Sequence, residues 1–268
     1  MRFCVAAIQM LATDDKVANL AQAAILVRDA VAQGASVVAL PEVFLWRGDK
    51  RKERDFAEPI PGPSSDAMAE LARELGIYLL AGSMLEKIPA GGKAYNTSLL
   101  FDPAGHVIAK YRKIHLFDVE LENGVSVKES ETREFGESLV VTESNLCPMG
   151  LSICYDLRFP ELYRALAQQG AQLIFVPSAF TSYTGKAHWE PLLRARAIEN
   201  QVYIIAPDQF GENPKSFATH GHSMIIDPWG DIVAERPDGP GVVLAEVDLN
   251  YLAKVRVELP ALMHRKLF

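Results

Sequence analysis

Apolar positions along the chain follow two spacings in turn, and this alternation predicts strands and helices that succeed one another. Short unbroken apolar runs, such as 37–40 and 174–176, are typical of strands that helices cover on both faces of a sheet. Between such runs, apolar residues recur every three or four positions, and a glycine often follows the last of them. The pattern predicts strands at 3–9, 36–40, 77–83, 96–101, 107–113, 150–154, 173–177, 202–208, 223–227, 231–235 and 242–247, and helices at 16–33, 64–75, 160–169 and 188–200.

The second half of the chain repeats the order of elements found in the first half. Each half runs strand, helix, strand, helix, strand, and then adds strands joined by a tight turn, at 102–105 and at 228–230. Two such halves predict an α/β protein with two facing sheets and helices outside, a four-layer αββα sandwich with internal pseudo-symmetry. Because no stretch rich in Pro, Gly and Ser separates the halves, we expect residues 1–268 to form one domain.

Composition and charge narrow the classes of function. Of the 268 residues, 49% are apolar and 23% are charged, which excludes a disordered or collagen-like chain. The net charge of −7 disfavours a nucleic-acid partner, and we interpret the most basic stretch, 50–54, as a solvated surface segment. The first ten residues resemble a strand more than a signal peptide, and no apolar run reaches the roughly 20 residues of a membrane span. We therefore expect a cytoplasmic protein with no membrane partner.

The three cysteines are too few and too irregularly spaced for a disulfide framework or a zinc site, and free thiols indicate a reducing compartment. Cys154 differs from Cys4 and Cys147 because it ends an apolar strand just before a helix. Active residues of α/β proteins gather at the carboxyl ends of strands, and a helix N-terminus favours the thiolate. A buried structural cysteine explains the same position equally well, and for Cys4 and Cys147 it is the favoured interpretation.

Two other strand ends carry ionisable residues. Glu42 follows one buried strand and Lys113 ends another, and either residue alone is explained by a strand that emerges into solvent. With Cys154 they form a set suited to nucleophilic acyl transfer: a base, a cation that stabilises an oxyanion, and a strong nucleophile. The chain lacks a Walker loop, a dinucleotide-binding glycine motif and a metalloprotease motif, and its closest histidine pair, His220 and His222, has no obvious third donor. We therefore expect no metal and no organic cofactor.

The chain resembles the nitrilase-like carbon–nitrogen hydrolases over nearly its whole length. Four motifs in the order of the family carry the resemblance: 40–42, 111–117, 150–161 and 187–200. By this resemblance Glu42 is the general base, Lys113 stabilises the oxyanion and Cys154 is the nucleophile, while Glu129, sixteen residues after Lys113, matches a second family glutamate. The backbone N–H of Tyr155, at the start of the helix, is the expected second oxyanion donor.

The resemblance implies an αββα fold that pairs into homodimers or larger assemblies and cleaves a small-molecule carbon–nitrogen bond without a cofactor. Several later segments resemble the deaminated glutathione amidases first and the ω-amidases second, so we expect an amide of the first type. An ω-amide of a keto acid or an N-carbamoyl amino acid is the alternative; a nitrile is disfavoured because Tyr155 and Asp156, and not Trp-Glu, follow the cysteine. A different class of protein, a non-catalytic binding protein on this fold, is a further alternative. It is disfavoured because such a protein has no need for a buried lysine ammonium among carboxylates.

Several further residues are expected at the rim of the site. For Arg158 we favour a local ion pair with Asp156 or Glu161 over contact with the substrate. Thr184 is expected on a loop at 181–185 that forms a lip, and residues 119–134 are expected to form a long loop. The candidates for contact with the substrate are Phe117, Arg158, Phe180 and Thr181.

Overall fold

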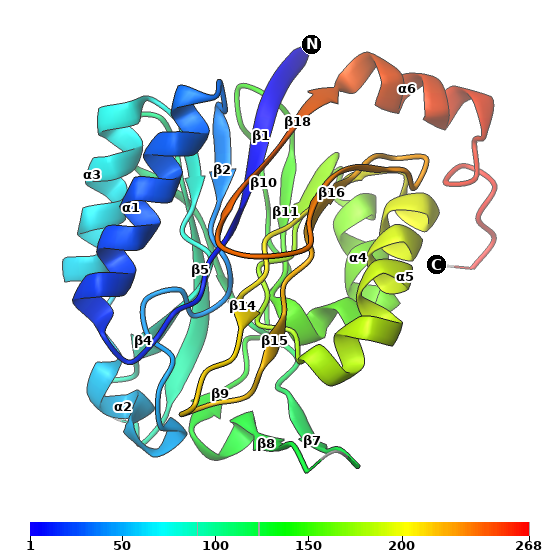
Figure 1. Ribbon diagram of the computed structural model, residues 1–268. Helices are drawn as coiled ribbons and strands as arrows, with labels where there is room; N and C mark the ends of the chain where they lie inside the picture. Colours follow the sequence, from blue (N-terminus) through cyan, green and yellow to red (C-terminus); the bar gives the residue numbers. More distant parts are fainter. Residues whose placement is uncertain (90, 123, 268) are drawn as a thin grey trace.

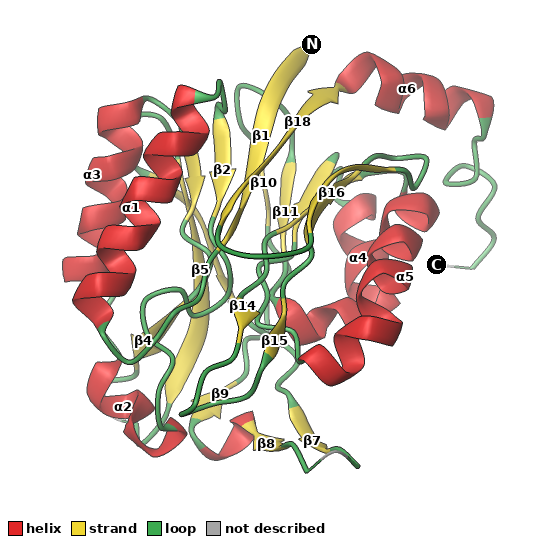
Figure 2. Ribbon diagram, in the orientation of Figure 1, coloured by secondary structure: helices red, strands yellow, loops and turns green. Residues whose placement is uncertain are grey.

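Two β-sheets pack face to face in the computed structural model, and helices cover the outer face of each sheet (Figure 1; Figure 2). The structure describes residues 1–89, 91–122 and 124–267. The order of layers confirms the predicted αββα sandwich. The outer helices are α1 (Lys16–Ala32) and α3 (Pro63–Leu75) on one side, and α4 (Pro160–Gln168) and α5 (Ser182–Asn200) on the other.

The first sheet has eight strands in the order β18-β1-β2-β3-β5-β4, with β6 and β9 also paired to β5. Strands β1, β2 and β3 are parallel, and β18 lies antiparallel to β1 (Figure 1). The strands are β1 (Arg2–Gln9), β2 (Val37–Ala39), β3 (Tyr78–Leu80), β4 (Met84–Lys87), β5 (Ala94–Phe101), β6 (Val107–Arg112), β9 (Arg133–Glu134) and β18 (Gly241–Asp248).

The second sheet has six strands in the order β10-β11-β12-β13-β16-β17, and its central strands β11, β12 and β13 are parallel. The chain path β11-α4-β12-α5-β13 matches β1-α1-β2-α3-β3, which confirms the predicted pseudo-symmetry. Two small hairpins, β7–β8 and β14–β15, lie outside the main sheets. The strands are β7 (Asp118–Glu120), β8 (Ser126–Lys128), β10 (Val141–Thr142), β11 (Met149–Leu151), β12 (Leu173–Phe175), β13 (Tyr203–Ala206), β14 (Phe210–Gly211), β15 (Thr219–His220), β16 (Ser223–Ile226) and β17 (Ile232–Arg236).

The side chains of β1 show why the predicted strands are unbroken apolar runs. Val5 and Ala7 join the core between the two sheets, while Ala6 and Ile8 join the core between the first sheet and α1 and α3. Successive residues of a strand point to opposite faces, so a strand buried on both faces needs apolar residues at every position.

Several elements differ from those predicted. Helix α5 begins at Ser182 with Thr181 as its N-cap, so the loop expected at 181–185 is wrong, although the segment does border the cavities at the site. Gly185, which suggested a loop, lies inside this helix. A glycine is needed there because a Cβ would come within 2.3 Å of the His220 ring. The long loop expected at 119–134 contains regular structure instead: the β7–β8 hairpin, the 3-10 helix η2 (Glu129–Glu131) and β9.

The stretch at 50–54 is the solvated segment expected from its charge at Arg51, Lys52 and Arg54, which are exposed, but not at Glu53. It forms the 3-10 helix η1 (Lys50–Lys52) and the start of α2 (Glu53–Phe56), and Glu53 points inward and is buried. The last helix, α6 (Leu249–Glu258), was not predicted. Within the part of the chain that the structure describes, no helix combines the length and apolar character needed to cross a membrane.

Candidate active site

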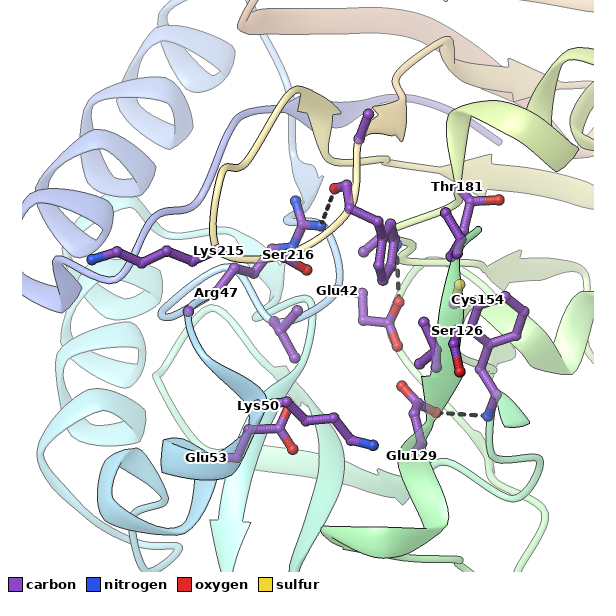
Figure 3. A pocket seen from close by; sticks show the side chains of 18 of the residues that line it. Glu42, Arg47, Lys50, Glu53, Ser126, Glu129, Cys154, Thr181, Lys215 and Ser216 are labelled. Carbon is purple, nitrogen blue, oxygen red and sulfur yellow. Dashed lines mark hydrogen bonds between the residues drawn. The ribbon is translucent and has the colours of Figure 1, made fainter. Parts of the chain in front are cut away.

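The four residues expected to carry chemistry line one cavity of about 470 Å³. Figure 3 shows three of them, Glu42, Glu129 and Cys154, around this cavity. Glu42 follows β2, Lys113 follows β6, Cys154 follows β11, and Glu129 begins η2. The parallel strands β2 and β11 belong to facing sheets, and the segments that follow them both reach this cavity. The site is therefore built where residues from the two sheets meet.

Lys113 is held between two carboxylates. Its Nζ donates to Glu42 Oε1 at 2.9 Å and to Glu129 Oε2 at 2.9 Å, and the side chain is only 1% exposed. Burial alone lowers the pKa of an ammonium, but the charges of Glu129 and Glu42 outweigh it and raise the pKa of Lys113. Lys113 is thus a cation, and two of its three N–H groups are engaged.

Glu129 is fixed as an anion by three donors. Besides Lys113, the Phe117 backbone N–H donates to its Oε2 at 2.9 Å, and Arg133 donates to its Oε1. Burial pushes the pKa of Glu129 upward, but Lys113 and Arg133 outweigh burial and lower this pKa to about 2. Arg133 in turn binds both oxygens of Glu53, at 2.6 and 3.1 Å. A buried relay of charges therefore runs from Glu53 to Glu42.

Glu42 accepts hydrogen bonds through both carboxylate oxygens. Asn96 Nδ2 donates to Oε1 at 2.8 Å, alongside Lys113, and the Ala179 backbone N–H donates to Oε2 at 2.9 Å. Gln209 holds the Glu42 carbonyl, and Val43, the next residue, has a strained φ of 45°. These contacts fix the carboxylate in one place beside the cavity.

Cys154 is the first residue of the 3-10 helix η3 (Cys154–Arg158) and has a φ of 46°. Its backbone N–H donates to the Pro177 carbonyl at 3.0 Å, which holds the turn. Burial raises the pKa of the Cys154 thiol well above its ordinary value, Glu42 raises it further, and Lys113 only partly opposes them. The helix N-terminus at Cys154 therefore does not make the thiolate the favoured form, because one short turn of helix does not offset burial beside a carboxylate.

The Tyr155 backbone N–H is the second of η3, where a helix leaves its first N–H groups without partners of its own. Asp156 secures this turn from inside: it accepts from the Ile153 N–H at 2.8 Å, from Tyr111 Oη at 2.7 Å and from the His115 N–H at 3.1 Å. Tyr155 therefore presents its N–H beside Cys154 on a firmly held turn.

Arg158 does not form the local ion pair that the sequence suggests. The Asp156 oxygens are taken by other donors, and among the described residues Arg158 has no ion pair with Glu161. Its guanidinium lies 5.3 Å from the centre of the Phe180 ring and bonds the His188 ring at 3.2 Å. The candidates for substrate contact do come together, in a small cavity next to Cys154 lined by Phe117, Tyr155, Arg158, Phe180, Thr181 and Thr184.

The structure adds buried polar residues that the sequence did not reveal. Asn96 lies in β5 next to two further buried polar residues, Thr97 and Ser98, and this polar run inside a strand is the one available signal. Glu53 and Arg133 meet from 80 positions apart, which gives no local signal. Asp208, just after β13, accepts from the Phe180 N–H at 2.9 Å, and burial raises the pKa of its carboxyl well above the ordinary value. Asp208 thus holds the segment that carries the Ala179 N–H to Glu42.

The described histidines and acidic residues do not gather into a metal site. No set of three or more His, Cys, Asp or Glu side chains in 1–89, 91–122 and 124–267 is arranged to hold a metal ion. The His220 and His222 rings stack 4.4 Å apart, and His222 bonds Glu235.

The chain is similar to known proteins both in sequence and in structure. The family model described as "Carbon-nitrogen hydrolase" matches residues 4–257 of the chain. The chain is 44% identical to the deaminated glutathione amidase of Synechocystis sp. over 98% of each protein. It is 41% identical to omega-amidase NIT2 of Danio rerio, over 99% of this chain and 95% of the relative.

A solved structure is similar over the same extent. The C. elegans NitFhit protein superposes with a TM-score of 0.93 at 39% identity, covering 99% of this chain. The chain spans 65% of the length of that structure, so the likeness concerns one part of the larger protein.

Proposed function

The chain belongs to the carbon–nitrogen hydrolase family, and from this premise we propose that it is an amidase that hydrolyses deaminated glutathione through an acyl-enzyme on Cys154. The observation that carries the chemistry is the position of Lys113. Two of its N–H groups bind Glu42 and Glu129, so one donor of a buried cation is left for an oxyanion in the same cavity as the thiol.

In the first half of the proposed reaction, Glu42 takes the proton of Cys154 Sγ while the sulfur attacks the amide carbon. A base is needed at that moment because burial keeps the thiol protonated. Lys113 and the Tyr155 N–H hold the oxygen that becomes negative. When the carbon–nitrogen bond breaks, Glu42 gives its proton to the departing amine, and a thioester remains on Cys154.

In the second half, Glu42 takes a proton from water, which attacks the thioester carbon. The carbon–sulfur bond breaks, the acid product leaves, and the proton returns to Sγ. Glu129 stays an anion throughout and positions Lys113, since three donors hold its carboxylate in the ionised form.

Two cavities meet at Cys154, and the size of the larger one supports the substrate assignment. Deaminated glutathione consists of a 2-oxoglutaryl group joined by an amide bond to cysteinylglycine. The smaller cavity, by Arg158 and Phe180, has a volume of about 10 Å³, which is the space of one water molecule, so the acyl group also has to lie in the larger cavity. The cavity of about 470 Å³ has room for the leaving dipeptide.

Omega-amidase activity is the second candidate. An ω-amide such as α-ketoglutaramate has the same acyl group, which would lie in the same large cavity. Its leaving group is ammonia, however, for which a cavity of about 470 Å³ is far larger than needed. The size of the large cavity therefore favours deaminated glutathione.

The test is a comparison of substrates that share a product. Release of 2-oxoglutarate from deaminated glutathione and from α-ketoglutaramate is followed, with N-carbamoyl amino acids and simple nitriles assayed for ammonia. We expect the highest kcat/KM for deaminated glutathione, no turnover by Cys154→Ala, and normal turnover by the control Cys147→Ala. Labelling of Cys154 by iodoacetamide without turnover of any amide would instead support a non-catalytic binding protein.

We also propose that the protein is a cytoplasmic homodimer. Its three cysteines are free, and three large apolar side chains are about half exposed in one region: Ile198 on α5, Trp229 in the turn after β16 and Leu259 at the end of α6. Ile198 lies against Gly230, the residue after Trp229, and Gln201 at the end of α5 donates to the Leu259 carbonyl. The segments that carry the three side chains are therefore neighbours. Ile198→Asp should sediment as a monomer while Val17→Asp, exposed on α1, stays dimeric; a monomeric wild type would contradict the proposal.

A further inference from the structure

Arg47 enters the large cavity from the segment after β2 with its backbone held at both ends. Its N–H donates to the Thr13 carbonyl at 2.8 Å, and its carbonyl accepts from Asn213 Nδ2 at 2.9 Å. The side chain is 5% exposed and lines the same cavity as Cys154. In the view of Figure 3, Arg47 and Cys154 lie on opposite sides of Glu42.

The guanidinium of Arg47 is buried with its hydrogen bonds incomplete. Nη2 donates to the Phe217 carbonyl at 3.2 Å, the dashed line beside Arg47 in Figure 3, and the Phe217 ring lies 5.3 Å away. Nη1 is fully covered and has no partner among the described residues, nor does any of them form an ion pair with Arg47. Burial lowers the pKa of Arg47 to about 10, so the group is still a cation at neutral pH.

The other cations in the wall of this cavity are already paired with carboxylates. Lys113 and Arg133 bind the glutamates of the buried relay, Lys50 lies 3.4 Å from Glu131, and Lys215 extends away to Asp14. The charges of Asp208 and Glu42 act on Arg47, but neither carboxylate forms an ion pair with it in the described part of the chain. A buried donor without a partner is rare and costly, so a guanidinium that lines a cavity with one nitrogen unpaired points to an anion that arrives with the ligand.

We propose that Arg47 binds the terminal carboxylate of the leaving half of the substrate, as a specificity-determining residue of the amidase. The inference rests on the proposed function, in which the leaving amine is a dipeptide. In an extended dipeptide the carboxylate lies about 7 Å from the amide nitrogen, a length that a cavity of about 470 Å³ can contain. A guanidinium suits this task because it meets both oxygens of a carboxylate at once.

The first test compares two substrates that differ only in this carboxylate: deaminated glutathione and its C-terminal amide. Wild type should prefer the acid, and Arg47→Gln should lower kcat/KM for the acid by about 10- to 100-fold, as expected for a lost charge-assisted hydrogen bond. The same variant should change kcat/KM for the amide by less than about threefold. Arg47→Lys should recover only part of the loss, since an ammonium cannot bind both oxygens in the same way.

A matched control is Arg51→Gln, which removes the same charge four positions along the chain. Arg51 is exposed and pairs with Asp49, so this variant should match wild type on both substrates. Equal losses on acid and amide in Arg47→Gln would assign Arg47 a structural role only and overturn the proposal. So would a wild type that shows no preference between acid and amide.

A second test separates this proposal from the proposed function because it needs no turnover. Calorimetry measures binding of cysteinylglycine and of cysteinylglycine amide to Cys154→Ala, and to the double variant with Arg47→Gln. The acid should bind at least about tenfold more tightly than the amide in Cys154→Ala only. If wild type fails to cleave deaminated glutathione yet this difference persists, the proposed substrate is wrong and the carboxylate site stands. Equal binding of acid and amide to Cys154→Ala overturns the site.

Discussion

Lys113 and Cys154 share one cavity yet are held in opposite states. The ammonium keeps its charge because Glu42 and Glu129 bond it directly, whereas the thiol keeps its proton because burial and the nearby Glu42 charge disfavour a second anion. Each residue thus has the form that the first step needs: a cation ready for the oxyanion and a nucleophile that is activated only when Glu42 takes its proton.

The first prediction concerns the shape of the cation. Lys113→Arg should lower kcat by about 100- to 1,000-fold, the effect of losing one oxyanion donor, because a planar guanidinium cannot replace a compact ammonium between two carboxylates. Steady-state assays of the variant measure this. Lys110→Arg is the control, since Lys110 lies on β6 just before Lys113, but its partly exposed side chain binds Glu86 outside the cavity. A Lys113→Arg enzyme with near-wild-type rates would remove Lys113 from the oxyanion role.

Substitution of Glu42 and substitution of Glu129 should impair different steps of the reaction. Glu42→Gln should stop acylation, because the thiol then has no base, so mass spectrometry should detect no acyl-enzyme and hydroxylamine should not restore turnover. Glu129→Gln should slow turnover while Cys154 still reacts with iodoacetamide, because Glu129 only positions Lys113. An acyl-enzyme that forms in Glu42→Gln at the wild-type rate would contradict the assignment of the base. A Glu129→Gln enzyme with unchanged kinetics would contradict a positioning role.

Strand ends indicated Glu42, Lys113 and Cys154 as candidates, and the resemblance to a family added Glu129; the structure places all four around one cavity. The residues that hold them in place were not predictable in the same way. Whether a charged residue such as Glu53 or Arg47 points inward depends on partners far along the chain, and neither spacing nor composition carries that information.

At the scale of elements, β4, β5 and β6 share one charged cluster that fixes the strand leading to Lys113. Glu86 on β4 accepts from Thr97 on β5 at 2.7 Å and from Arg112 on β6 at 2.8 and 2.9 Å. Burial pushes the pKa of Glu86 upward, but Arg112 and Lys110 outweigh it and lower this pKa to about 2. The cluster therefore sets the position of β6 immediately before the site.

The lowered pKa of Glu86 predicts that part of the free energy of unfolding is lost at acidic pH. A lowered carboxyl pKa stabilises the fold above the unfolded-state value of 4.5, and the contribution is lost as the pH falls toward about 2. Urea unfolding should show Glu86→Gln less stable than wild type by about 1–2 kcal/mol at pH 7, with a smaller difference at low pH. Glu70→Gln, at an exposed carboxylate on α3, serves as the control. A difference that does not change with pH would contradict this account.

Local periodicity predicted most strands and helices. It failed where contacts with distant parts of the chain determine the start of an element or its neighbour in a sheet. The start of α5 was hidden by Gly185, which serves contact with His220 and not a turn. The strand at 242–247 was placed by its apolar pattern, but its partner β1 lies at the other end of the chain. A strand shows the same apolar pattern whichever sheet it joins, so the pairing of this strand with β1 was not predictable.

At the scale of the whole molecule, the two halves share one core, and β18 returns the chain to the first sheet. The apolar cluster between the sheets includes Val5 and Val37 from one sheet and Leu151 and Ile205 from the other. We therefore propose that the chain unfolds as one domain, and calorimetry should show a single transition. Two separate transitions would contradict a single domain.

The central claim is a covalent acyl-enzyme on Cys154, and rapid quenching followed by mass spectrometry tests it most directly. Wild type mixed with deaminated glutathione should carry a 2-oxoglutaryl group on the peptide that contains Cys154, and Cys154→Ala should show neither this adduct nor turnover. Substantial turnover by Cys154→Ala, or an acyl group found on another residue, would contradict the account.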